Sequence, residues 1–97
     1  MTNINYEAMD DEETFVPHHM RGAYQRWIEN GLGAGGFGMA LITGDLGAAI
    51  ARADMTNAKH ILSSFNWFKQ HAPSGSFGSA EKADCWVGTK AGKQSSN

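Results

Sequence analysis

Apolar residues recur with helical spacing in several segments of the chain, and no stretch alternates with period two for long enough to indicate a strand. The clearest helical pattern starts after Pro17 and stops at Asn30-Gly31, because glycine commonly follows the last turn of a helix. Its apolar positions fall at i, i+3, i+4, i+7 and i+8 and are Met20, Ala23, Tyr24, Trp27 and Ile28. This spacing predicts an amphipathic helix.

Two shorter helices are expected next. The first follows the glycine-rich segment 31–36 and repeats apolar residues at helical spacing at Phe37, Ala40 and Leu41. Thr43 or Asp45 can cap the second. The apolar positions of this second helix are Leu46, Ala49, Ile50 and Ala53. The rest of its surface is mostly alanine, so neighbouring elements can approach it closely.

The longest helix is predicted to follow a cap at Asp54 or Thr56 and to end near Gln70, ahead of Pro73. Its inward positions are Ala58, Ile61, Leu62, Phe65 and Phe68. Ser79 can cap a last short helix, whose inward positions are Ala83, Trp86 and its final residue Val87. The fold prediction is therefore all-α: a compact small domain of about four to five short helices with disordered termini.

Length and the polarity of the two ends predict the domain organisation. The 97 residues are enough for one domain. Residues 1–13 are acidic and residues 88–97 are small and polar, so we expect a disordered tail and a flexible tail around a helical domain of residues 14–87. Because a core of about 75 residues buries only roughly 60 to 65% of its unfolded surface, we also expect a homo-oligomer.

Charge and cysteine content narrow the function classes. The formal net charge is -2, although residues 14–87 alone hold six basic and five acidic side chains. A nucleic-acid-binding domain normally shows a clustered basic surface, so nucleic acid is not the expected partner. No apolar run approaches the ~18 residues of a membrane span. A single Cys85 and an N-terminus without a secretory pattern favour the reducing cytoplasm.

Several short motifs follow one another in a characteristic order. They are Tyr24-x-x-Trp27-Ile28-Glu29-x-Gly31, Gly35-Gly36-Phe37, Gly44-Asp45-Leu46, Arg52-Ala53-Asp54 with Asn57, Trp67-Phe68, and the segment 71–79. Together they resemble a family of small proteins of tailed bacteriophages, over roughly residues 17–86. The chain differs at Ala34, Gly44 and Phe77, where the family has proline, asparagine and tryptophan. The resemblance implies a phage origin and action in the cytoplasm of the host cell, and no particular activity.

Two segments could hold a phosphate-bearing ligand. Arg52 can fork onto a phosphate, and the segment 74–79 could offer hydroxyls and backbone N–H groups to an anion. The structural alternatives are an internal ion pair for Arg52 and helix capping for the segment. Trp67 lies off the inward positions of its helix, so we expect it to be exposed and able to stack on a base. The candidate ligand-binding residues are therefore Tyr24, Arg52, Asp54, Asn57, Trp67, Ser74, Ser76, Phe77 and Ser79.

No pattern predicts catalysis or a bound cofactor. Gly31, Gly33 and Gly36 match Gly-x-Gly-x-x-Gly, but they follow a helix rather than a strand, so a dinucleotide fingerprint is not indicated. The four histidines and Cys85 lack the spacing of metal ligands, and nothing brings paired carboxylates together. We therefore expect neither an enzyme nor a metal or cofactor site.

These patterns lead to several function hypotheses. The first is a non-enzymatic phage-encoded binding protein that counters or redirects host functions, in its most specific form an oligomeric sponge for a nucleotide-type signal of host immunity. The alternatives are an inhibitor that binds a host protein, and a small DNA-binding regulator with a helix-turn-helix made of residues 45–53 and a helix from Asn57. A module that only assembles, through its alanine-rich third helix, is a further alternative.

Overall fold

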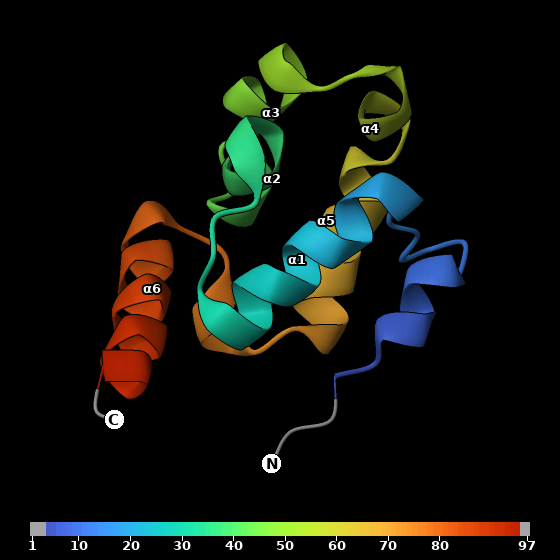
Figure 1. Ribbon diagram of the computed structural model, residues 1–97. Helices are drawn as coiled ribbons and strands as arrows, with labels where there is room; N and C mark the ends of the chain where they lie inside the picture. The colour runs from blue at the N-terminus through green and yellow to red at the C-terminus, as the bar shows by residue number, and fades with distance from the viewer. Residues whose placement is uncertain (1–3, 96–97) are drawn as a thin grey trace.

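The computed structural model describes the backbone of residues 4–95 and the side chains of residues 4–90, and this part of the chain is helical without a strand. The α-helices and 3-10 helices (η) in chain order are η1 (Tyr6–Asp10), α1 (His18–Asn30), α2 (Gly35–Ile42), α3 (Leu46–Arg52), α4 (Met55–Lys59), α5 (Ile61–His71), η2 (Ser74–Ser76) and α6 (Ala80–Ser95) (Figure 1). The all-α prediction is confirmed. None of the described helices combines the length and the apolar character that crossing a membrane requires.

Local signals set several helix ends as the sequence predicts. Gly31 adopts a left-handed conformation with φ 71°, and its N–H bonds back to the carbonyl of Trp27. A side chain would be strained in this conformation, which explains glycine at the end of α1. Three side chains cap helices by accepting a backbone N–H: Asp45 from Ala48, Asp54 from Asn57 and Ser79 from Lys82.

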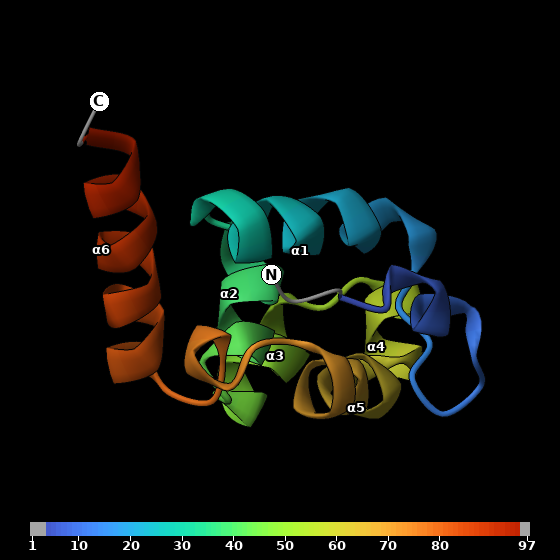
Figure 2. The same cartoon turned by 90° about the horizontal axis from the view of Figure 1, so that it is seen from below.

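The core lies where α1 crosses α5, with α2 beside both (Figures 1 and 2). The inward face of α1 is buried as predicted, including Tyr24 and Trp27. The Tyr24 ring meets Phe68 of α5 edge to face, with the ring centroids 5.0 Å apart. Gly38 of α2 allows close approach here, because a Cβ at this position would lie 3.4 Å from the Tyr24 ring and 2.7 Å from Ala34.

Three tryptophans connect segments that are distant in the sequence, each by donating its indole N–H to a backbone carbonyl. Trp27 donates to Ser76 at 2.8 Å and so attaches η2 to α1. Trp86 of α6 donates to the carbonyl of Trp27 at 2.9 Å. Trp67 of α5 donates to Asn5 at 3.0 Å. Each bond satisfies a polar atom that burial would otherwise leave unpaired.

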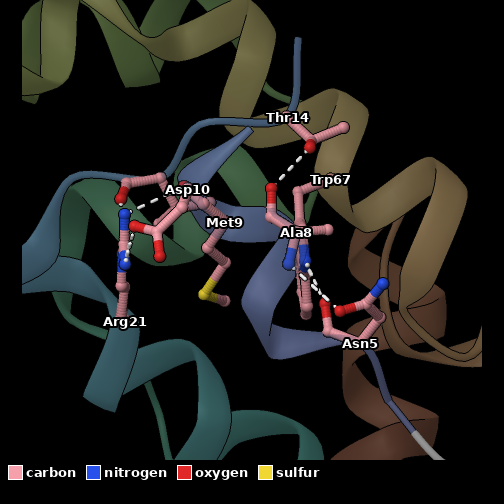
Figure 3. Close-up of polar contacts among 8 residues, drawn as sticks. Asn5, Ala8, Met9, Asp10, Thr14, Arg21 and Trp67 are labelled. Atoms are coloured by element: carbon pink, nitrogen blue, oxygen red, sulfur yellow. Dashed lines mark hydrogen bonds and ion pairs between the residues drawn. The ribbon is translucent and has the colours of Figure 1, made fainter. Parts of the chain in front are cut away.

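The N-terminal segment differs from the predicted disordered tail over residues 4–13. These residues form η1 and fold back against α5, and Ala8 and Met9 are buried. Figure 3 shows that the segment is held at both ends: Trp67 reaches Asn5, while Arg21 bonds the carbonyl of Met9 and the carboxylate of Asp10. The apolar residues of this segment are too sparse to show a period in the sequence, but they have tertiary partners in the structure. Residues 1–3 lie outside the described part.

The predicted longest helix is two helices, α4 and α5, separated at His60. Within α5, Leu62 is exposed instead of inward, while Trp67 is buried instead of exposed. Trp67 lies on the face of α5 that meets η1, where it contacts Asn5 and Tyr6.

The C-terminal helix is longer than predicted. α6 continues past Val87 to Ser95, so the prediction of a flexible tail from residue 88 differs from the structure. Trp86 anchors this helix to α1, and the ammonium group of Lys90 lies 4.6 Å from the centroid of the Trp86 ring. Residues 96–97 lie outside the described part.

Candidate functional site

An apolar groove of about 610 Å³ opens between α3 on one side and α4 and α5 on the other, with α2 as its floor. Figure 1 shows the two walls at the same end of the molecule, where the chain passes from α3 to α4. The residues that line it are Ala40, Leu41, Gly44, Asp45, Leu46, Ala49, Ile50, Ala58, Lys59, Ile61, Leu62 and Phe65. We call this surface the α3–α5 groove.

Large apolar side chains protrude from the walls of the groove. Leu46 and Ile50 of α3 are each 60% exposed, and Leu62 of α5 is 74% exposed. Met55, the first residue of α4, is 80% exposed. Isolated exposed hydrophobic side chains are ordinary, but a contiguous group around a hollow is typical of an interaction surface. Among the described residues, four of the six exposed large hydrophobic side chains belong to α3, α4 and α5.

The short length of α3 explains why its apolar side chains stay exposed. This seven-residue helix packs on α2 through Ala49, which is buried. Leu46 and Ile50 are one turn apart and face the groove instead, where they form a ridge. The apolar helix positions Leu46 and Ile50 are therefore largely exposed, each to 60%. Helical spacing places apolar residues on one face, but it does not determine what covers that face.

Two charged residues of opposite sign line the groove. Asp45 precedes α3, and Lys59 ends α4. One carboxylate oxygen of Asp45 accepts the backbone N–H of Ala48. Within the described residues, neither Asp45 nor Lys59 forms an ion pair. Both charges are therefore available to groups of a bound partner.

The three aromatic residues among the ligand-binding candidates, Tyr24, Trp67 and Phe77, pack within the protein. Tyr24 and Trp67 are completely buried in the chain, so neither can stack on a ligand without unfolding. The Trp67 ring is parallel to that of Tyr6, with ring centroids 5.8 Å apart, which shows that its face is already occupied. Phe77 is half-buried and packs its ring against Phe65 and Phe68. The expectation of an exposed Trp67 was wrong.

The contacts of the serine-rich loop, residues 74–79, support the helix-capping alternative and not ligand binding. Ser76 is buried, and its hydroxyl donates to the carbonyl of Pro73 at 2.6 Å. The hydroxyl of Ser79 caps α6. Ser74 is exposed. The loop also closes against the end of α2, where the N–H of Gly78 donates to the carbonyl of Ile42 at 2.8 Å.

The Arg-Ala-Asp motif is divided between a capping residue and an unpaired cation. The Asp54 carboxylate caps α4 and lies 3.3 Å from Nε2 of His19. Asn57 is 5% exposed and its Oδ1 lacks a hydrogen-bond partner among the described residues. Arg52 is exposed, and the described residues give it neither a hydrogen bond nor an ion pair. The internal ion pair considered for Arg52 is therefore not formed.

The structure does not bring Arg52 and the serine-rich loop together. The Arg52 guanidinium lies beside the first turn of α2, where a Cβ on Gly36 would be 3.1 Å from its Nη1. The loop approaches the other end, where the carbonyl oxygen of Gly78 would lie 3.2 Å from a Cβ on Gly44. The eight residues of α2 separate these two points by about 12 Å. They do not form one phosphate site.

The buried asparagine also changes the helix-turn-helix interpretation. That hypothesis places Asn57 at a base-reading position, but its side chain is buried, and α4 has only five residues. A recognition helix needs an exposed face that enters the major groove. This arrangement gives no support to the DNA-binding alternative.

The tyrosine hydroxyls are unsuited to acid–base chemistry at neutral pH. Burial raises the pKa of the Tyr24 phenol well above its ordinary value. Burial and the neighbouring Glu29 carboxylate raise the pKa of Tyr6 to about 12. Both phenols therefore stay protonated. The described residues contain no group of three or more histidine, cysteine, aspartate or glutamate side chains that could hold a metal ion.

Comparison with protein-family models, with curated proteins and with solved structures finds no match to the chain. The groove is therefore interpreted from its own geometry and chemistry.

Proposed function

We propose that the protein is a non-enzymatic binding protein that docks a polypeptide surface in the α3–α5 groove. The observation that carries this proposal is the ridge of Leu46 and Ile50 facing Leu62 across an apolar hollow. The exposed apolar surface of these three side chains is removed from water only when a partner covers it. Covering it favours association by about 1 to 2 kcal/mol for each side chain, because each is already partly buried.

The form of the groove favours a polypeptide over a small molecule. Small-molecule sites usually enclose 70 to 90% of their ligand and carry a few convergent polar groups. Here Leu46, Ile50 and Leu62 line the groove and are each more than half exposed, so they protrude instead of enclosing a small ligand. A partner with an extended surface covers the ridge and the hollow together.

The resemblance to phage proteins supports a biological setting for this docking. A phage protein that binds stoichiometrically would act in the cytoplasm of the infected cell, where it would counter or redirect a host function. This part of the proposal depends on the motif order between Tyr24 and Ser79 and not on the groove.

A site-specific cross-linking experiment tests the docking proposal. A photoreactive phenylalanine derivative replaces Leu62 in the groove, or Gln70, which is exposed at the other end of the same helix, as the matched control. We expect irradiation of cells to attach a polypeptide at position 62 and none at position 70. No adduct at position 62, or equal adducts at both positions, would show that the groove does not dock a polypeptide.

A second candidate function is the oligomeric sponge for a nucleotide-type signal. The observation that favours it is Arg52, whose unpaired guanidinium stands beside the glycines that begin α2. Arginine is well suited to bind phosphate by two parallel hydrogen bonds. Saturating nucleotides or cyclic oligonucleotides should raise the melting temperature of the protein and leave that of Arg52→Ala unchanged. An unchanged melting temperature of the unmodified protein would exclude this candidate.

A further inference from the structure

We infer that the occupant of the α3–α5 groove is a second copy of this chain, bound reciprocally so that the α3 ridge of each copy lies in the groove of the other. This inference rests on the proposed docking function and names its partner. It gives the expected homo-oligomer a specific interface.

The chain contains both a ridge and a hollow. Leu46 and Ile50 project from α3, and the small side chains of Ala40, Ala49 and Ala58 leave space beside them. A helix with two protruding apolar residues one turn apart is the kind of element that such a hollow receives. α3 of a second copy is such a helix, and it has an uncovered ridge of its own.

The two charged residues of the groove are complementary to the same two residues of a second copy. Asp45 and Lys59 have opposite sign, line the same groove and form no ion pair within the described residues. In a twofold dimer, a contact between a first residue of one copy and a second residue of the partner is formed twice. The second residue of the first copy also contacts the first residue of the partner. Asp45 of one copy then meets the partner's Lys59, and the reverse contact forms at the same time. An unrelated helix would need its own matching charges.

The small size of the domain provides a third argument. A standard interface covers about 800 Å² of each partner, which is about one seventh of the 5767 Å² surface of this chain. The ridge and the hollow are formed by residues of α2, α3, α4 and α5. Closed twofold dimers are the most common assembly of soluble homo-oligomers.

Sedimentation velocity of the purified full chain at micromolar concentrations tests the inference. The expected species has twice the 10.5 kDa mass of one chain. Ile50→Lys should reduce the mass to that of one chain, because it places a charge in the apolar interface. Val87→Lys is the matched control, since Val87 is also exposed and apolar but lies on α6, and this variant should stay dimeric. Unchanged helical circular dichroism shows that each variant is folded.

A charge exchange tests the reciprocal geometry. Asp45→Lys and Lys59→Asp each place like charges opposite each other at both contacts, so each variant alone should dissociate about tenfold or more readily. An equimolar mixture of the two restores opposite charges at both contacts and should recover the dimer. Recovery on mixing is not explained by loss of the Asp45 cap, because the mixture contains the same uncapped chain.

Specific outcomes would overturn the inference. A monomer at all concentrations would refute the second copy as occupant. So would dissociation of Val87→Lys with an intact Ile50→Lys dimer, or a mixture of the charge variants that stays monomeric. The cross-linking experiment then separates the two proposals. An adduct of another mass at position 62 would leave the docking function standing with a different partner, whereas no adduct would remove both.

Discussion

Met9 provides the sharpest test of whether the N-terminal segment belongs to the fold. Its side chain is 1% exposed within η1, and it belongs to the core cluster together with Val16 and Trp27. Met9→Ala removes the three side-chain heavy atoms beyond Cβ and leaves the charges and the hydrogen bonds of the segment in place. The change therefore tests packing alone.

The expected loss follows from burial. At about 0.8 kcal/mol per buried methylene-sized group, the three atoms account for roughly 2.4 kcal/mol, and the cavity that remains adds to this value. We expect the free energy of unfolding to fall by about 3 kcal/mol, within the range of about 2 to 5 kcal/mol for such substitutions. In a domain of this size the melting temperature should fall by roughly 10 to 20 °C.

Urea denaturation followed by tryptophan fluorescence measures this loss. The midpoint should fall while the slope with urea concentration stays the same. The matched control is Glu12→Ala, since Glu12 is exposed in the same segment, and its effect should stay within about 0.5 kcal/mol. If Met9→Ala changes the unfolding free energy as little as Glu12→Ala does, residues 4–13 do not pack on the core and the disordered-tail prediction stands.

Two further predictions concern single buried positions. The Tyr24 hydroxyl is buried without a hydrogen-bond partner among the described residues. Tyr24→Phe should therefore raise the free energy of unfolding by about 1 kcal/mol. A decrease of that size in urea denaturation would show that the hydroxyl forms a hydrogen bond. Gly31→Ala should lower the melting temperature, because its φ of 71° costs alanine about 1 to 2 kcal/mol and the new Cβ would lie 2.8 Å from Cβ of Lys90. Gly33→Ala, with no atom within 4 Å of its Cβ position, should have little effect, and equal shifts for both variants would contradict this explanation.

Sequence patterns predict some residues of the α3–α5 groove but not the groove itself. They identify Leu46, Ile50 and Leu62 as apolar helix positions, and the structure places all three at the groove. They do not identify the groove, because they place Leu62 on an inward face, whereas it is 74% exposed in the structure. The exposed alanine surface noted for the third helix was the available signal, since small side chains there leave space for a partner.

Features that depend on a few adjacent residues can be derived from the amino-acid sequence alone. The all-α class follows from helical periodicity, and the end of α1 follows from Gly31. The starts of α3, α4 and α6 follow from the side-chain oxygens of Asp45, Asp54 and Ser79. These signals act within one helical turn, so the local chain contains all the information they need.

Which apolar faces are covered depends on the packing of segments that are distant in the sequence. Trp67 is buried because Asn5, 62 residues away, accepts its indole N–H and because Tyr6 lies parallel to its ring. Leu46 and Ile50 remain exposed because α3 meets α2 through its alanines. Burial is a property of pairs of segments, and a helical period specifies a face but not its partner. For this reason the sequence predicted the helices, whereas the groove depended on how they pack.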